Sequence, residues 1–202
     1  MAGIEMIGII FSKQKAFTLI ELMITLVVMG IVIGMAIPKF NTLILNNKSV
    51  AVGEDFVGAL NLARSMAVKK GGRASLCATI DGLKCSDNPE SWAKGFMAIE
   101  DFATSDNAAA PVLVGPDFPQ GNILRVWGAQ GQDIQTRIQV SQGGSPATFI
   151  RFTALGTLAR VVPNAVDAEQ INVRMVGCTG NSARKIKVGW AGVIGVTNDV
   201  CP

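Results

Sequence analysis

One apolar segment, residues 17–37, constrains the fold more than any other feature of the sequence. It runs from Phe17 to Ile37 and holds a single charged residue, Glu21. At a rise of about 1.5 Å per residue, a helix of this length covers about 30 Å, which is enough to cross the hydrocarbon core of a bilayer. The sequence therefore predicts a transmembrane helix near the start of the chain.

The residues beside this segment predict its orientation. Lys13 and Lys15 precede it, and no basic residue follows before Lys39. Because basic flanks tend to remain in the cytoplasm, we expect the start of the chain to be cytoplasmic and the remainder to be exported. No A-x-A cleavage site follows the segment, since residues 36–38 lead directly into more helix-like sequence. We therefore expect the helix to be retained rather than removed as a signal peptide.

Glu21 is the unusual residue of this helix. A carboxylate at the centre of a membrane helix costs about 2.5–3.5 kcal/mol on insertion scales, and less near the interface. Because Glu21 lies near one end of the segment, its side chain can extend to the interface. Alternatively, it meets a partner charge when the helix leaves the lipid. The residues alone leave both interpretations open.

The composition excludes several kinds of chemistry. The 202 residues include no histidine and no tyrosine, which removes the commonest general base and the commonest metal ligand. The Gly-Gly pairs at 71–72 and 143–144 are isolated and typical of turns. We expect neither enzymatic activity nor a metal or cofactor, and the net charge of +3 is too small to indicate a nucleic-acid partner.

Four cysteines form one close pair, Cys77 and Cys85, and one distant pair, Cys178 and Cys201, without CxxC spacing. In an exported domain, an even number of cysteines favours disulfides, whereas zinc sites use tighter ligand clusters. Metal binding and free thiols are the disfavoured alternatives. A bond between Cys178 and Cys201 would enclose the last hairpin and contribute about 3 kcal/mol, and a bond between Cys77 and Cys85 would close the loop ATIDGLK.

Beyond Pro38 a helical pattern continues to about Lys70. Apolar residues recur there at intervals of three and four and form one stripe, namely Val52, Phe56, Leu60, Ala63 and Ala67. Lys69 and Lys70, followed by glycines at 71 and 72, form a helix stop. We expect one long helix, interrupted or kinked near residues 34–38 because proline lacks a backbone N–H.

From residue 74 onward, short apolar runs alternate with Gly, Pro, Asn and Asp, which predicts a mostly antiparallel β head. The expected strands are Ala74–Thr79, Gly95–Glu100, Ile123–Trp127, Ile134–Val140, Thr148–Thr153, Ile171–Met175, Lys185–Trp190 and Val193–Thr197. The last two form a hairpin that turns at residues 191–192. Trp92, Trp127 and Trp190 lie in strand-like stretches and are expected in the core. The expected fold class is α+β, with a long N-terminal helix packed on the β head.

The sequence KAFTLIEL, residues 15–22, resembles the processing motif of type IV prepilins and type II secretion pseudopilins. In that family, a peptidase removes a short basic leader directly before a phenylalanine, and the new N-terminus is methylated. The resemblance implies cleavage between Ala16 and Phe17, N-methylation of Phe17, and a mature chain with Glu21 fifth and Pro38 twenty-second. The family usually has glycine where this chain has Ala16. Translation from Met6 rather than Met1 would give a leader of more usual length.

The same resemblance implies a role for Glu21 and a set of partners. In the family, the fifth-position glutamate is thought to meet the α-amino group of a neighbouring subunit, so Glu21 would pair with Phe17 of the adjacent chain during assembly. The implied partners are the prepilin peptidase, the pilus assembly platform, the inner membrane, and other minor and major pilins. The implied domains are a leader at 1–16, a transmembrane and assembly helix at 17–38, its amphipathic continuation at 39–72, and a periplasmic head at 73–202.

Four blocks of the head resemble minor pilins and pseudopilins of the GspH/FimT/FimU type. These blocks are LARSMAVKKGGRASLC, SWAKGFMAIED, TFIRFTALG and ARKIKVGWAGVIGV with the cysteine that follows. The resemblance implies a minor subunit that helps to initiate pilus assembly and lies at or near the tip, in twitching motility, adhesion or DNA uptake. It implies an inner-membrane location before assembly and a pilus location afterwards. A GspH-like pseudopilin of type II secretion is the alternative.

A DNA-binding competence pilin is a further alternative, which the residues disfavour. FimT-like members that bind DNA carry Gly-Arg-x-Arg in the C-terminal hairpin, whereas residues 192–195 read GVIG here and lack both arginines. Arg184, Lys185 and Lys187 lie nearby and could form a weak basic patch for phosphates. Three cations on one strand are more often a solvated face, and we expect a nucleic-acid partner not to be the main one.

Overall fold

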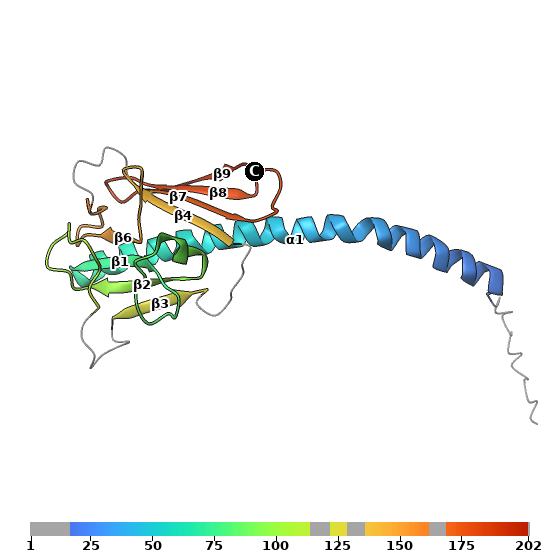
Figure 1. Ribbon diagram of the computed structural model, residues 1–202, viewed down its shortest axis with the longest axis horizontal. Coiled ribbons are helices and arrows are strands. Elements are labelled where there is room, and N and C mark those ends of the chain that lie inside the picture. The colour runs from blue at the N-terminus through green and yellow to red at the C-terminus, as the bar shows by residue number, and fades with distance from the viewer. Residues whose placement is uncertain (1–16, 114–121, 129–135, 162–168, 202) are drawn as a thin grey trace, which may run out of the picture. The chain divides into compact units, whose positions relative to one another are not determined.

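The computed structural model describes residues 17–113, 122–128, 136–161 and 169–201. The chain forms two compact units, Met1–Phe40 and Asn41–Pro202. The described part of the first unit is almost entirely helical, and the second combines the end of the same helix with β-strands (Figure 1). The α+β class expected from the sequence is confirmed.

Helix α1 spans Leu19–Lys70 and is assigned without a break through residues 34–38. The interruption considered from the sequence is therefore not present, and the kink at Pro38 stays a prediction. A proline inside a helix removes only its own N–H from the hydrogen-bond ladder, so turns on both sides can remain helical. The leader, residues 1–16, lies outside the described residues.

The helix ends at Lys70, as the sequence predicts. The Gly72 N–H donates to the Ala67 carbonyl, and the Gly71 N–H donates to the Val68 carbonyl, both at 3.2 Å. Gly71 has φ of 62°, in the left-handed region that glycine adopts without a steric penalty. This pair of bonds is a Schellman motif, which satisfies carbonyls that the last turn would otherwise leave unpaired.

The described residues of the head form two antiparallel sheets, and Figure 1 labels all of their strands except β5. The first sheet has the order β3-β2-β1-β6, with β1 at Arg73–Ala78, β2 at Phe96–Asp101, β3 at Ile123–Trp127 and β6 at Phe149–Phe152. The second has the order β5-β4-β7-β8-β9, with β4 at Thr136–Gln142, β5 at Ser145–Pro146, β7 at Glu169–Met175, β8 at Ala183–Val188 and β9 at Ile194–Asp199. We name them sheet A and sheet B.

The expected strands correspond to eight of these nine, with ends that differ by a few residues. The start of the run expected at Ile134 lies outside the described residues, and β4 is seen from Thr136. Strand β5 and the short helix η1, Pro89–Ala93, were not expected. The placement of two tryptophans in strands is wrong, because Trp92 lies in η1 and Trp190 lies in the turn between β8 and β9.

The second half of α1 supplies one side of the core. The expected apolar stripe is confirmed: Phe56, Leu60, Ala63 and Ala67 are completely buried, and Val52 is partly buried. The Phe56 ring centroid lies 5.5 Å from that of Trp92 and 4.9 Å from that of Phe96. Trp92 donates its indole N–H to the Ala147 carbonyl at 2.7 Å, so burying this ring leaves no polar atom unpaired.

A buried ion pair lies between β2 and β6. Arg151 and Asp101 have fully buried side chains, and the Arg151 Nε donates to the Asp101 Oδ2 at 2.7 Å. The other guanidinium N–H groups donate to the carbonyls of Asp106, Ala108 and Ala110. Asp101 Oδ1 accepts hydrogen bonds from the N–H groups of Ala103 and Val112, both at 2.9 Å. Together the two charges hold the segment 102–113 in place.

The ion pair and its hydrogen bonds set the charge state of Asp101. Burial raises the pKa of this carboxyl, but hydrogen bonds from the Ser75 hydroxyl, the Val112 N–H and Arg151 outweigh the burial and leave the pKa below its ordinary value. Asp101 is therefore ionised in the folded head.

Candidate functional site

The first turn of α1 contains the residues that the sequence singles out for assembly. Thr18 caps the helix, because its Oγ1 accepts a hydrogen bond from the Glu21 N–H at 3.3 Å and its carbonyl accepts one from the Leu22 N–H at 3.2 Å. The pattern Thr18-x-x-Glu21 is that of a capping box, a readable signal that our sequence analysis missed. Glu21 is exposed in this first turn, where a carboxylate is favoured by the positive end of the helix dipole.

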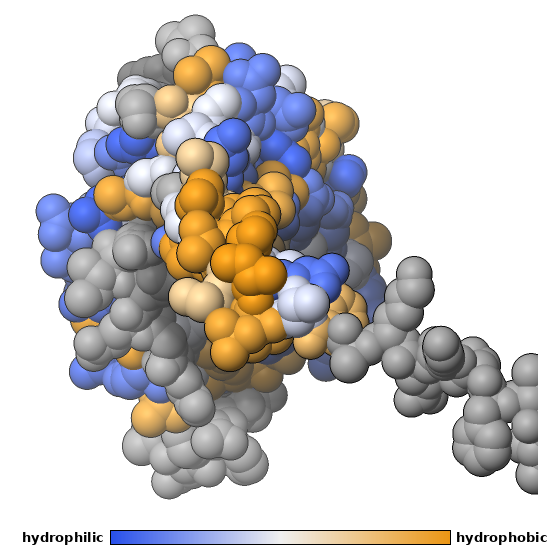
Figure 2. Space-filling model, turned by 90° about the vertical axis from the view of Figure 1, so that its right-hand side faces the viewer, coloured by the Kyte–Doolittle hydropathy of each residue, from blue (hydrophilic) through white to orange (hydrophobic). Residues whose placement is uncertain are grey.

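The helix that follows presents apolar side chains on every side. Helix α1 is long and apolar enough to cross a membrane, and its most apolar window is not covered by other described residues. Figure 2 shows apolar side chains gathered on the surface that faces the viewer. The exposed apolar residues of this segment include Leu19, Ile20, Leu22, Met23, Ile24, Leu26, Val27, Val28, Met29, Ile31, Val32, Ile33, Met35 and Ile37. A surface of this kind needs lipid or other helices around it.

The processing residues stay predictions. Ala16 lies outside the described residues, and Phe17 is exposed just before the helix begins. The role of Glu21 in charge pairing also depends on a second subunit.

Two disulfides join the four cysteines, Cys77 with Cys85 and Cys178 with Cys201. The first closes the loop after β1, where Asp81 Oδ1 accepts the N–H groups of Leu83 and Lys84. The second joins the loop after β7 to the chain end after β9, so it encloses the β8–β9 hairpin. No free cysteine occurs among the described residues.

The loop of the second disulfide is fixed to α1. Asn46 makes two hydrogen bonds to Thr179: its Oδ1 accepts the Thr179 N–H at 2.8 Å, and its Nδ2 donates to Thr179 Oγ1 at 3.2 Å. Ser49, which is completely buried, accepts the Met175 N–H at 3.3 Å. The C-terminal loop of the head is therefore anchored to the helix by side-chain hydrogen bonds as well as by packing.

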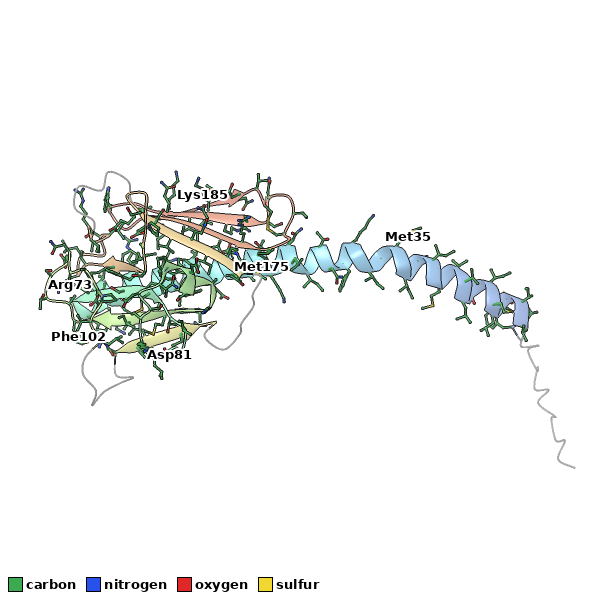
Figure 3. All side chains as sticks on the ribbon, in the orientation of Figure 1. Met35, Arg73, Asp81, Phe102, Met175 and Lys185 are labelled. Atoms are coloured by element: carbon green, nitrogen blue, oxygen red, sulfur yellow. A yellow bond between two sulfur atoms is a disulfide. The ribbon has the colours of Figure 1, made fainter. Side chains whose placement is uncertain are left out.

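The three cations considered as a basic patch do not share one face. Arg184 lies against α1: its Nε is 3.4 Å from Glu54 Oε1, and its side chain fills the space beside Gly53. Lys185 and Lys187 project from the opposite face of β8, since successive side chains of a strand point to opposite sides. Figure 3 shows Lys185 on the side of sheet B that is turned away from α1. The structure thus removes Arg184 from the expected patch.

The described residues contain no group of three or more Cys, Asp or Glu side chains that could hold a metal ion. One buried acid outside the Asp101 cluster is Glu169, at the start of β7, whose Oε1 accepts from the Gln142 Nε2 at 2.8 Å. Burial raises the pKa of Glu169 well above its ordinary value, although the hydrogen bond from Gln142 opposes this. Its Oε2 has no hydrogen-bond partner among the described residues.

Comparison with known proteins agrees with these features. The model of the prokaryotic N-terminal methylation motif matches residues 11–37, and the model of the type II transport protein GspH matches residues 52–192. The chain belongs to the GspH family. Its GspH-matching part includes α1 from residue 52 and the strands β1 to β8 of the head. A search among curated proteins finds no match.

Two solved structures are similar to the chain, both crystal forms of the type IV minor pilin FimU from Pseudomonas aeruginosa strain PAO1. One is 20% identical over 75% of this chain and 89% of FimU, with a TM-score of 0.47. The other is 22% identical over 73% of this chain and 90% of FimU, with a TM-score of 0.45.

Membership of the family carries consequences for the chain. The GspH-family protein is a pilin-like structural subunit rather than a member of an enzyme family, and the family implies assembly with other pilins. The methylation motif and the apolar helix fit a protein that is held in the inner membrane before it enters a filament.

Proposed function

We propose that this protein is a minor pilin of a type IV pilus, which helps to initiate assembly and lies at or near the pilus tip. Prepilin peptidase removes residues 1–16 by cutting between Ala16 and Phe17, and Phe17 is then N-methylated. Before assembly, residues 17–38 cross the inner membrane and the head, residues 73–202, lies in the periplasm. The observation that carries the proposal is Glu21, exposed in the first turn of a helix whose apolar first half, Leu19 to Ile37, is not covered by other described residues.

The proposed contact is an ion pair between subunits. After cleavage, the α-amino group of Phe17 in one subunit meets the Glu21 carboxylate of its neighbour inside the apolar core of the filament. An unpaired charge in such a core is costly, commonly by about 3–5 kcal/mol when one partner of a buried pair is removed. Pairing therefore selects the alignment of neighbouring helices along the filament at which the two charges meet.

Replacement of Glu21 by Gln tests this contact, because it keeps the shape of the side chain and removes its charge. We expect membrane levels to be unchanged and the amount of the chain in sheared filaments to fall strongly. Asp55→Asn is the matched control, since Asp55 is an exposed acid on the second half of the same helix. Mass spectrometry of the membrane fraction should find methylated Phe17 at the N-terminus in all three proteins. Normal filament entry of the Glu21→Gln variant would contradict the proposed pairing.

The second candidate is a minor pseudopilin of a type II secretion system. It is favoured by the GspH model itself, which matches residues 52–192 under the description of a type II transport protein. Deletion of the gene, followed by a pilus count and an assay of secreted enzymes in the same strain, separates the two. Loss of pili with normal secretion supports the minor pilin, and the reverse supports the pseudopilin.

DNA uptake through the β8–β9 hairpin is less well supported. The Gly-Arg-x-Arg motif is absent from residues 192–195, and Arg184 pairs with Glu54 on the helix side of sheet B. Twitching, adhesion and uptake all depend on the partners of the subunit, so the deletion strain should be scored for each.

A further inference from the structure

Four strands form the edges of the two sheets, and within the described residues three of them are protected against pairing with another chain. Strand β3 carries an exposed arginine, Arg125, and its register with β2 shifts between residues 98 and 99. Strand β5 has two residues, one of which is Pro146. Strand β6 is followed by chain that returns along it, where the Ala159 N–H donates to the Arg151 carbonyl. Charges, bulges, prolines and covering segments are the usual devices for protecting an edge.

Strand β9 has no bulge, proline or covering segment among the described residues, and its one charged residue, Asp199, is the last residue of the strand. It is six residues long, contains no lysine or proline, and pairs with β8 in an unbroken register. The turn shows which residues of β9 bond to β8, because the Gly189 N–H donates to the Val193 carbonyl at 2.9 Å. Bonded pairs recur every second residue in an antiparallel ladder, so residues 195, 197 and 199 face β8. The backbone N–H and C=O groups of Ile194, Val196 and Asn198 therefore point outward, without a partner among the described residues.

The side chains on the two faces of sheet B next to β9 indicate what kind of strand could pair with it. On the outer face, the register places Lys187 beside Gly195 and Lys185 beside Thr197. Gly195 has no side chain, and a Cβ there would meet only the Lys187 carbonyl oxygen at 3.9 Å, so no side chain of β9 separates Lys187 from a further strand. On the inner face, Val196 is 39% exposed and offers an apolar contact. A strand with acidic residues on its outer face and apolar residues on its inner face complements Lys185, Lys187 and Val196, whereas Asp199 on the outer face marks the end of the complementary stretch.

We propose that β9 receives an extended segment of a neighbouring filament subunit, in which acidic and apolar residues alternate, as an added strand of sheet B. The identity of the donor rests on the proposed function, whereas the addition of a strand rests only on β9 and β8. Backbone hydrogen bonds to Ile194, Val196 and Asn198 would hold the segment, and Lys185 and Lys187 would select its charge.

The probe is a short capped peptide in which glutamate and valine alternate, titrated against the full-length chain in detergent. The matched peptide has lysine in place of glutamate. We expect the acidic peptide to bind at least about tenfold more tightly, because Lys185 and Lys187 repel the basic one. The double variant Lys185→Glu/Lys187→Glu should reverse this preference.

A backbone change distinguishes strand addition from simple charge attraction. Val196→Pro removes an outward N–H, while the ladder to β8 uses residues 195 and 197, so we expect binding of the acidic peptide to fall about tenfold or more. Val196→Thr keeps the N–H and should bind as the parent does. An acidic peptide N-methylated on every backbone nitrogen has no edge that can donate hydrogen bonds to β9, so it makes the same test on the unchanged chain and should not bind.

Several results would overturn the proposal. It is wrong if neither peptide binds, or if the N-methylated acidic peptide binds as tightly as the plain one. It is also wrong if duplex DNA binds, depends on Lys185 and Lys187 and is unaffected by Val196→Pro, since the face would then be a phosphate site. Self-association that Val196→Pro abolishes would assign the edge to a second copy instead. Because the peptide assay uses no filament, failure of the Glu21 experiment does not alter its outcome.

Discussion

The clearest stability prediction concerns Arg151, whose guanidinium joins three parts of the head. It pairs with Asp101 at 2.7 Å and donates to three carbonyls of the segment 102–113. Replacement by methionine keeps much of the aliphatic volume and removes the charge and the donors. The Asp101 carboxylate would then be buried without its cation.

The magnitude follows from the burial of both partners. Removing one member of a fully buried ion pair costs about 3–5 kcal/mol, because the other charge is left without a counter-charge in a low-dielectric interior. Asp101 would keep the hydrogen bonds from Ser75, Ala103 and Val112, which places our expectation for Arg151→Met near the lower end of that range. For comparison, Arg125→Met should cost less than about 1 kcal/mol, since Arg125 is exposed and lies 4.9 Å from the centroid of the Trp127 ring.

Urea unfolding of the full chain in detergent, monitored by tryptophan fluorescence, measures the loss in free energy of unfolding for both variants. The pH dependence supplies a second readout, because the pKa of Asp101 lies below 3.8 in the folded protein. A lowered pKa contributes stability that is present above pH 3.8 and lost as the pH falls through the folded pKa, so the difference between parent and variant should narrow in acid. A loss below about 1 kcal/mol for Arg151→Met, equal to that of Arg125→Met, would refute the reasoning.

The remaining predictions concern Glu169 and the disulfides. Glu169 has a raised pKa, so the folded state binds more protons than the unfolded state above the ordinary value of 4.5, and the free energy of unfolding should fall as the pH rises from there. Glu169→Gln removes this titration and should be more stable than the parent at pH 8 but not at pH 4; parallel stability curves would contradict it. Replacing Cys178 and Cys201 by serine should cost about 3 kcal/mol, and replacing Cys77 and Cys85 about 2.5 kcal/mol, because a loop of 23 residues loses more entropy on closure than one of 8. Equal or reversed losses in urea unfolding would show that chain entropy does not set the order.

Elements with a strong local signal were predictable from the sequence. The stripe from Val52 to Ala67 has helical spacing, and the lysines and glycines at 69–72 form a motif whose bonds are seen in the structure. The alternation of apolar and polar residues predicted the β8–β9 hairpin and placed Ile186 and Lys187 on opposite faces of β8. The same alternation, extended back by two residues from Ile186, places Arg184 on the face that packs against α1. The basic patch could therefore have been corrected from the sequence.

Arg151 shows what could not be predicted. In TFIRFTALG it occupies a place that alternation assigns to solvent, between two apolar residues. All four residues of β6 are nevertheless buried, because the segment 102–113 covers the face on which Arg151 lies and supplies carbonyls to it. That segment is far away in the sequence and has no periodic pattern, so no local signal connects the two. Likewise, η1 is a single short turn, and only its contact with the core explains the burial of Trp92.

The energetics of the proposed assembly step explain why one carboxylate can matter among so many apolar residues. Moving the first half of α1 from lipid into a filament exchanges one apolar environment for another, and lipid tails are about as apolar as leucine. The exposed Leu, Ile, Val and Met side chains from Leu19 to Ile37 therefore contribute close packing but no large hydrophobic gain at this step. A carboxylate in a helix costs up to about 2.5–3.5 kcal/mol in the bilayer, and pairing with a neighbouring amino group would relieve part of that cost. Since the apolar terms nearly cancel, Glu21 would contribute a large share of the difference between lipid and filament and would determine the register.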